Sequence, residues 1–196
     1  GGVDATVLPG MKVVFLGRKR ITGVIGKKPI HLIPKDQRDK ALEIKDLWID
    51  VGARDKKDAE RRVNVGDCAC ISDNYQELFN GLVSSKALDD KAGTFVVSET
   101  LRLLSARRKK LNVAVFGVST VQEEIGSRGA ITSGYGIDPH AAIAIDVGFA
   151  TDAPGDEKKV TGDIKLGRGP ILHHGANINT VLGKMLQKGA GAAKVK

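Results

Sequence analysis

Three short acidic segments, each beside a glycine, hold the residue types of this chain that are best suited to chemistry. In chain order they are Lys86-Ala87-Leu88-Asp89-Asp90-Lys91-Ala92-Gly93, Val121-Gln122-Glu123-Glu124-Ile125-Gly126 and Ile143-Ala144-Ile145-Asp146-Val147-Gly148. An α/β scaffold presents catalytic groups from the rim of its sheet, where apolar runs end and loops begin. Carboxylate oxygens are hard ligands that suit divalent cations. Together the three segments predict a two-metal hydrolase.

The positions of these carboxylates distinguish them from surface charge, which is the usual explanation of a single acidic pair. Glu123 and Asp146 both follow apolar runs that are typical of core strands. Their carboxylates would therefore be poorly solvated unless they were paired or bound to a metal ion. Adjacent glutamates point in different directions on extended backbone, so one of Glu123 and Glu124 can hold a metal ion while the other reaches a bound water.

Helices and strands are predicted to alternate from residue 86 onward, which is typical of a layered α/β structure. Apolar periodicity predicts helices over 90–105, 127–133 and 178–188, the last two stopped by Gly134 and Gly189. Buried strands are expected over 111–118 and 141–147. Folding can then bring the three acidic segments together.

Residues 5–71 carry a different pattern, which predicts β-structure with one short helix. The apolar stretches 11–16, 21–25, 42–51 and 67–71 are separated by Gly, Pro and charged turns. A helix is predicted over 55–63, with Asp55 as its N-cap. This pattern is typical of a small barrel-like module.

The composition predicts a soluble globular protein, because 41% of the 196 residues are hydrophobic and 28% are charged. No apolar run approaches the ~20 residues that cross a bilayer, and residues 1–10 lack the regions of a signal peptide. Cys68 and Cys70 are expected to be free thiols, since no other ligand at zinc spacing accompanies them. We therefore expect a cytoplasmic protein with no membrane partner. The chain does not begin with methionine and starts like the interior of a longer sequence.

The net charge of +8 raises the alternative of a nucleic-acid-binding protein. The Lys/Arg clusters at 18–20, 107–110 and 194–196 are local, and no aromatic residues interleave with them to stack on bases. The cluster at 107–110 follows a predicted helix, whose negative end cations complement. We expect a solvated basic surface and no nucleic-acid partner.

Five segments give the chain a resemblance to a known family. They are Gly23–Leu32, Asp46–Ala53, Ala87–Gly93, Val121–Ala130 and Leu166–Pro170. As an ordered set they resemble the glutamyl aminopeptidases, the tetrahedral aminopeptidases and proteins once labelled cellulase M. The resemblance covers nearly the whole chain.

The resemblance implies an α/β fold, namely a zinc-peptidase-like (phosphorylase/hydrolase-like) three-layer α/β/α domain with an inserted small β-barrel-like domain. Residues 5–71 would form the inserted domain, and residues 1–4 and 72–196 would belong to the catalytic domain. It also implies a metal-dependent aminopeptidase with two divalent ions per subunit, zinc or cobalt, and a peptide substrate. Such proteins self-associate into homo-oligomers, up to a dodecamer.

By motif position, Asp89 resembles the carboxylate that bridges both ions. Glu124 resembles a ligand of one ion and Asp146 a ligand of the other. Glu123 resembles the general base that takes a proton from the attacking water. Asp90 has no direct role in this pattern, and we hypothesise that it orients its neighbour.

The family pattern also requires one histidine ligand for each ion, and neither histidine motif is present here. The four histidines are His31, His140, His173 and His174, and we expect all of them to be structural or exposed. A chain that lacks both ends of the family sequence would explain this, and its metal affinity and activity should be weak. A glycosidase using paired carboxylates and a non-catalytic basic binding module remain as alternatives.

Overall fold

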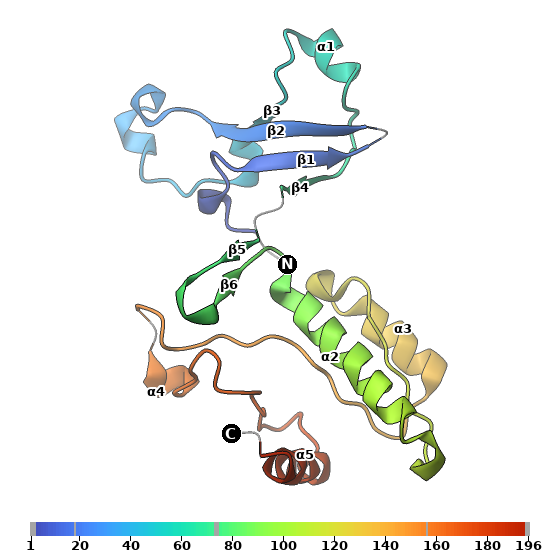
Figure 1. The fold of residues 1–196 in the computed structure, drawn as a ribbon. Helices are drawn as coiled ribbons and strands as arrows, with labels where there is room; N and C mark the ends of the chain where they lie inside the picture. Colours follow the sequence, from blue (N-terminus) through green and yellow to red (C-terminus); the bar gives the residue numbers. More distant parts are fainter. Residues whose placement is uncertain (1–2, 18, 73–74, 156, 195–196) are drawn as a thin grey trace.

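The computed structural model describes residues 3–17, 19–72, 75–155 and 157–194. Figure 1 shows a β-sheet with its loops at one end of the molecule and the longer helices at the other. Within the described residues no helix is long and apolar enough to cross a membrane.

The sheet has four antiparallel strands in the order β3-β2-β1-β4. Their bounds are β1 Lys12–Leu16, β2 Arg20–Lys27, β3 Leu47–Asp50 and β4 Ala69–Ile71. Each strand overlaps one of the four apolar stretches of the sequence. The prediction of β-structure in this region is therefore confirmed. In the described part of the chain β3 and β4 form the two edges, so the sheet is open.

The core of this region lies against one face of the sheet. Leu8, Val13 and Ile25 are buried there, and they are packed by Met11, Leu47, Ile49 and Ile71. The register explains this set, because Val13 pairs with Ile71 and Ile25 pairs with Ile49, which places all four side chains on the same face. Cys70 pairs with Val14 and so faces the opposite side. Cys68 and Cys70 are both free, as expected.

A short helix, α1 Lys56–Glu60, stands between β3 and β4. Asp55 caps it as predicted, because its side chain accepts a hydrogen bond from the Asp58 amide at 2.7 Å. The Asp58 carboxylate is itself buried and accepts hydrogen bonds from the Arg54 amide and from the Arg61 and Arg62 guanidinium groups. These bonds, the Arg54 amide first, hold the pKa of Asp58 below its ordinary value.

A two-stranded hairpin, β5 Gln76–Glu77 and β6 Val83–Ser84, connects the sheet to the helices and was not predicted from the sequence. Short 3-10 turns fill the loops, namely Ala5–Val7, Ile30–Leu32, Lys35–Gln37, Ile44–Asp46, Phe79–Gly81, Arg108–Lys110 and Glu123–Ile125.

The helices of the second half are α2 Leu88–Ser105, α3 Arg128–Ile137, α4 Lys158–Thr161 and α5 Thr180–Ala192. The three expected helices are present, but the predicted stops at Gly134 and Gly189 are wrong. Both carbonyls accept later helical amides, from Asp138 and Ala193, and neither glycine has a positive φ. A glycine costs a helix interior about 1 kcal/mol relative to alanine, which does not by itself end a helix whose backbone stays right-handed at that residue.

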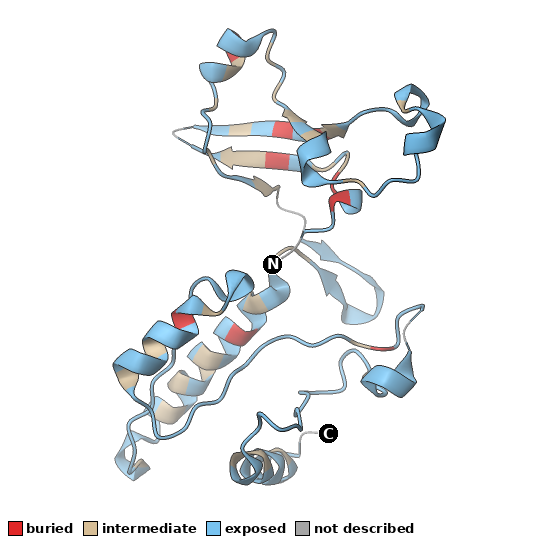
Figure 2. Cartoon of the chain, turned by 180° about the vertical axis from the view of Figure 1, so that it is seen from behind, coloured by how far each residue is buried: buried red, intermediate tan, exposed pale blue. Residues whose placement is uncertain are grey.

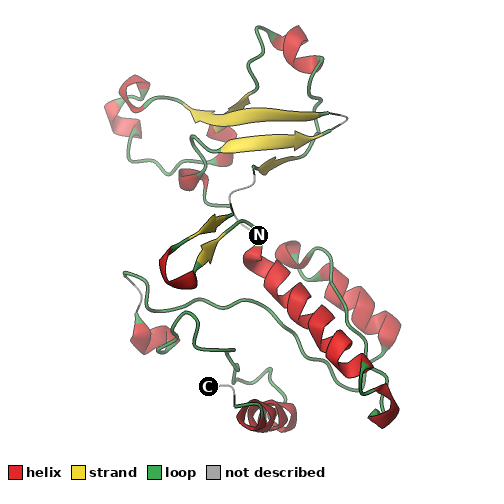
Figure 3. Ribbon diagram, viewed as in Figure 1, coloured by secondary structure: helices red, strands yellow, loops and turns green. Residues whose placement is uncertain are grey.

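The strands expected over 111–118 and 141–147 are not formed in the described part of the chain. Both segments run as loops without a strand partner (Figure 3). The first still packs on α2, because Gly117 lies so close to Val97 and Leu101 that it has no room for a Cβ. Most of its apolar side chains, including Phe116 at 64%, are exposed (Figure 2). An apolar run indicates that burial of the segment is favourable. A β-strand also requires a neighbouring strand with which to form hydrogen bonds.

Thr151 is a buried polar residue that ties a later loop together. Its amide donates to the Ile164 carbonyl at 2.7 Å, and its hydroxyl oxygen accepts from the Ile164 amide at 2.9 Å. The same hydroxyl donates to the Gly162 carbonyl at 2.8 Å. The loop between these residues, which includes α4, is therefore closed at its base.

Candidate metal centre

Asp89 and Asp90 lie at the start of α2. Ala87 has a left-handed backbone, with φ 57°, and neither aspartate has helical dihedral angles, so the regular helix begins at Lys91. The peptide bond between Asp89 and Asp90 is cis. The Asp90 carboxylate accepts a hydrogen bond from the Gly93 amide at 2.7 Å, which is the geometry of a helix N-cap. Asp89 is thus the last residue before the cap.

Glu123 and Glu124 lie in the 3-10 turn that precedes α3. The Glu123 carbonyl accepts hydrogen bonds from the Gly126 and Ser127 amides, at 3.0 and 2.9 Å. The Ser127 hydroxyl lies 3.3 Å from the Glu123 carboxylate and donates to it. Gln122, Gly126 and Ser127 all have positive φ values, so the chain reverses sharply around the two glutamates.

A longer-range hydrogen bond ties this turn to α3. The Gly129 amide donates to the Val121 carbonyl at 2.9 Å. Gly129 is buried, and a Cβ there would collide with the Val121 backbone amide and carbonyl. The residue must therefore be a glycine for the turn to pack against the helix.

Asp146 lies in the unpaired apolar segment 141–147. Its carboxylate accepts a hydrogen bond from the Val147 amide at 2.7 Å, and its side chain is exposed. This local bond orients the carboxylate relative to its own backbone.

The electrostatics of Asp89 connect the three acidic segments. Asp89 is exposed, and its pKa is raised above its ordinary value, first by partial loss of hydration and then by the negative charges of Glu124, Asp146, Asp90 and Glu123. The charges of the predicted carboxylates therefore act on Asp89 in the folded chain. Ionised carboxylates that repel one another are the environment that a divalent cation stabilises.

The donor set fits a divalent cation in charge and in ligand type but is incomplete. Among the residues that the structure describes, no three side chains of His, Cys, Asp or Glu are arranged so that they could hold a metal ion. The four histidines His31, His140, His173 and His174 are all exposed. The described residues therefore supply carboxylates, without a closed ligand cage.

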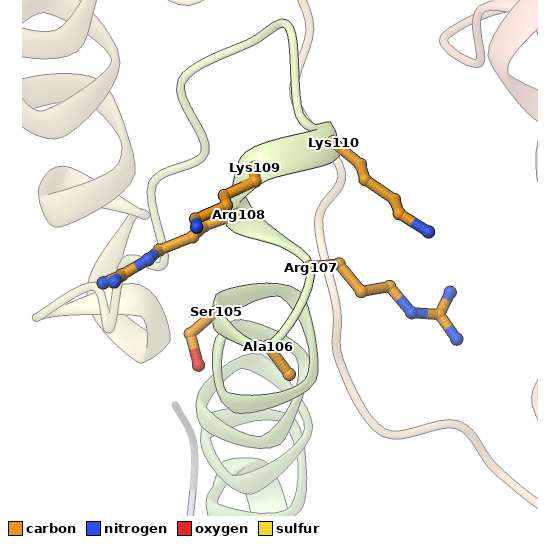
Figure 4. A pocket seen from close by; sticks show the side chains of 6 residues that line it. All are labelled: Ser105, Ala106, Arg107, Arg108, Lys109 and Lys110. Carbon is orange, nitrogen blue, oxygen red and sulfur yellow. The ribbon is translucent and has the colours of Figure 1, made fainter.

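The basic segment Arg107–Lys110 borders a separate cavity of about 490 Å³ at the end of α2, together with Ser105 and Ala106. In Figure 4 the Arg107 and Lys110 side chains point to one side of the chain, and those of Arg108 and Lys109 point to the other. Because these side chains point to opposite sides, the four cations do not surround a common position for an anion.

Two contacts of the candidate site were not anticipated from the sequence. One is the helix cap made by Asp90, and the other is the hydrogen bond from Ser127 to Glu123. The cap had a detectable signal, since an aspartate directly before the first residue of a helix is a usual N-cap. The Ser127 contact had none, because it depends on the left-handed backbone of that residue.

The comparisons with known proteins agree with the motifs. A lysyl aminopeptidase of Pyrococcus furiosus is 34% identical over 186 residues, which are 93% of this chain and 51% of that protein. A TET aminopeptidase from a marine sediment archaeon of the Thaumarchaeota superposes with a TM-score of 0.87 at 33% identity, covering 100% of this chain and 56% of that one. The α/β fold expected from the sequence is therefore confirmed.

A second solved structure is the TET1 peptidase of Pyrococcus horikoshii, which can assemble into a tetrahedron or a large octahedral shell. It superposes with a TM-score of 0.78 at 29% identity and covers 100% of this chain and 58% of that one. The present chain thus spans about half the length of these relatives. Residues 1–196 match the profile of the M42 glutamyl aminopeptidases, and the chain belongs to that family.

Proposed function

We propose that this chain is part of a metal-dependent aminopeptidase that removes N-terminal residues from peptides. The observation that carries the proposal is the match of residues 1–196 to the M42 glutamyl aminopeptidases, and the effect of the Glu124, Asp146 and Glu123 charges on the pKa of Asp89 supports it. The family supports a peptidase, and the four carboxylates supply the residue types that a metal-dependent peptidase uses for ligation and proton transfer.

Three of the carboxylates would hold two divalent ions, zinc or cobalt. Asp89 would bridge both ions, Glu124 would bind one and Asp146 the other. The raised pKa of Asp89 supports this assignment, because the same negative neighbours that disfavour its ionisation would attract a cation. The ions, when bound, lower the pKa of a water molecule and polarise the peptide carbonyl.

Glu123 would act as the general base. Its carboxylate takes a proton from the attacking water and later donates it to the leaving amine. The two amides that bond the Glu123 carbonyl hold its backbone, and the hydrogen bond from Ser127 orients its side chain. A fixed base keeps the distance over which the proton moves short.

The remaining assignments concern the organisation of the protein. We assign residues 5–71 to an inserted barrel-like β-domain, and residues 1–4 and 72–196 to the catalytic domain. The strand order supports this division, since all four strands of the larger sheet lie between Lys12 and Ile71. We also propose assembly into a homo-oligomer, as the Pyrococcus horikoshii relative does, and retain the cytoplasmic location as a prediction.

Hydrolysis of aminoacyl-p-nitroanilides, measured with and without a chelator, tests this function. We expect cleavage that stops on complete metal removal and returns when zinc or cobalt is added. Activity that survives complete metal removal would exclude the two-metal mechanism. Cleavage of a cellulosic substrate in place of the peptide analogues would indicate a glycosidase, and salt-sensitive binding of a random DNA duplex would indicate a basic binding module.

A further inference from the structure

Three arginines meet on one buried carboxylate at α1. The Oδ1 atom of Asp58 accepts hydrogen bonds from Arg61 Nη2 at 2.9 Å and from Arg62 Nη2 at 3.4 Å. The Oδ2 atom accepts from the Arg54 amide at 3.2 Å and from its Nε at 3.4 Å. Each arginine stands three or four positions from Asp58, a spacing at which helical side chains are neighbours. Asp58 therefore holds one nitrogen of each guanidinium group close to those of the other two.

The outer sides of the three guanidinium groups are open to solvent. A guanidinium has five N–H donors, and in the described part of the chain each of these three donates from its side chain to Asp58 alone. The side chains of Arg54, Arg61 and Arg62 are 82%, 59% and 48% exposed, whereas that of Asp58 is 4% exposed. In Figure 2 most of α1 is coloured as exposed. Most of the arginine donors can therefore reach a molecule in solution.

One carboxylate does not balance the positive charge around it. Residues 54–62 contain five Lys or Arg and three Asp or Glu residues, so their net charge is +2. The three guanidinium groups exceed Asp58 by the same two charges. Like charges gathered at one point repel one another, and an anion bound on their outer side relieves this repulsion. A phosphate monoester carries a charge of about −1.5 to −2 at neutral pH, which matches the excess.

The basic segment Arg107–Lys110 provides a contrast within the same chain. It carries four positive charges and no carboxylate. Its side chains point to opposite sides of the chain, so they share no point at which one anion could meet them all (Figure 4). The arginines at α1 do share such a point, because each of them contacts the same carboxylate. The arrangement of the cations, and not their number, distinguishes the two segments.

We propose that Arg54, Arg61 and Arg62 form a binding site for a phosphate group, on the side of the guanidinium groups that faces away from Asp58. Guanidinium groups match phosphate oxygens through paired N–H donors, and one phosphate can accept from more than one of them. A carboxylate offers two oxygens and a single charge, so it matches the cluster less well. The site shares no residue with the proposed metal centre, and the inference does not depend on the aminopeptidase function.

The test is titration of the full chain with inorganic phosphate at constant ionic strength, followed by NMR of the arginine Nε–H signals. The signals of Arg54, Arg61 and Arg62 should shift together and saturate with one dissociation constant. Acetate at the same ionic strength should bind at least about tenfold more weakly, because it forms fewer charged hydrogen bonds. Arg61→Ala and Arg62→Ala should each weaken phosphate binding about tenfold. Shifts that do not saturate, or equal affinity for acetate, would overturn the proposal.

Arg108→Ala is the matched control, since it removes the same charge from the other basic segment and should leave phosphate affinity unchanged. Asp58→Ala separates an organised site from simple attraction. Loss of this carboxylate makes the region more positive, so attraction by charge alone would tighten phosphate binding. The proposed site predicts weaker binding, because the guanidinium groups are no longer held together.

Circular dichroism shows whether Asp58→Ala stays folded, and if it unfolds, the comparison of Arg61→Ala with Arg108→Ala decides alone. Equal losses of phosphate affinity in Arg61→Ala and Arg108→Ala would contradict the site, as would tighter binding in a folded Asp58→Ala variant.

Discussion

The Ser127 hydroxyl donates a hydrogen bond to the Glu123 carboxylate, and it does so from a residue whose backbone is left-handed, with φ 53°. Ser127→Gly removes the hydroxyl and still tolerates this backbone. One hydrogen bond contributes about 0.5–1.5 kcal/mol, so we expect kcat to fall roughly 2- to 12-fold with little change in KM. Steady-state kinetics measure this split. Ser127→Asn, which tolerates the same backbone and supplies an amide donor, should recover part of the loss, and a kcat for Ser127→Gly equal to that of the unmodified enzyme would exclude the contact from catalysis.

Glu123→Gln should lower turnover about 10²- to 10⁴-fold, because an amide cannot take a proton from water. Zinc binding should persist, since Glu123 is assigned no metal. Kinetics with a p-nitroanilide substrate and calorimetric titration with zinc measure the two properties separately. Normal turnover would remove the assignment of Glu123 as the base, and loss of zinc together with turnover would reassign it as a ligand.

Asp146→Asn should lower the raised pKa of Asp89 in the metal-free protein. The Asp146 charge is one of the causes of that elevation, and removing a like charge makes ionisation of Asp89 easier. The carboxyl carbon resonance of Asp89, followed by NMR over the acidic range, measures the change. Asp138→Asn, which removes a charge that does not contribute to the elevation, should leave the titration of Asp89 where it was. A pKa that rises or stays constant in Asp146→Asn would contradict the convergence of the two segments.

Asp58→Asn should reduce thermal stability by several degrees near neutral pH. Asp58 has a lowered pKa, so its contribution to stability is fully present above its ordinary pKa of 3.8 and is lost as the pH falls through the lower folded value. The difference in melting temperature between the variant and the unmodified protein should therefore shrink below about pH 4. Thermal denaturation at neutral and acidic pH measures it. Glu60→Gln alters an exposed ion pair with Lys56 at 3.7 Å and should have almost no effect at either pH.

Gly129→Ala should destabilise the protein by roughly 1–3 kcal/mol, because the added methyl group collides with the backbone of Val121. It should also lower activity, since the displaced turn carries both glutamates. Gly136→Ala in the same helix has open space around it and should instead stabilise the protein by about 0.5–1 kcal/mol. Denaturant unfolding of both variants measures the contrast. Equal effects of the two substitutions would show that Gly129 is not constrained by Val121.

Local signals in the sequence predicted the local elements well. Asp55 caps α1 as expected, and each of the four apolar stretches overlaps one of the strands β1 to β4. These elements depend on interactions between residues that are close in sequence or on simple alternation of apolar residues. The helix stops at Gly134 and Gly189 failed because a glycine ends a helix only where the backbone turns left-handed, which neither residue does.

Features that depend on distant partners were predicted less completely. The apolar segment 111–118 was identified as buried strand, yet pairing requires a neighbour that an apolar pattern does not specify. The order of the acidic segments predicted that Asp89 and Asp146 would interact, and the raised pKa of Asp89 agrees. The assignment of each carboxylate to a particular metal ion stays a prediction, because it depends on ligand geometry and not on motif order.

The hydrogen bond between Gly129 and Val121 closes nine residues into a ring that contains both glutamates. Because this hydrogen bond joins the turn to the first turn of α3, the turn and the helix are connected at both ends of the ring. If the helix rotates or slides, Glu123 and Glu124 are displaced together and keep their separation from each other, while their distances to Asp89 and Asp146 change. The spacing inside the glutamate pair is therefore protected from motion of the fold, and the spacing between segments is the quantity that such motion would adjust.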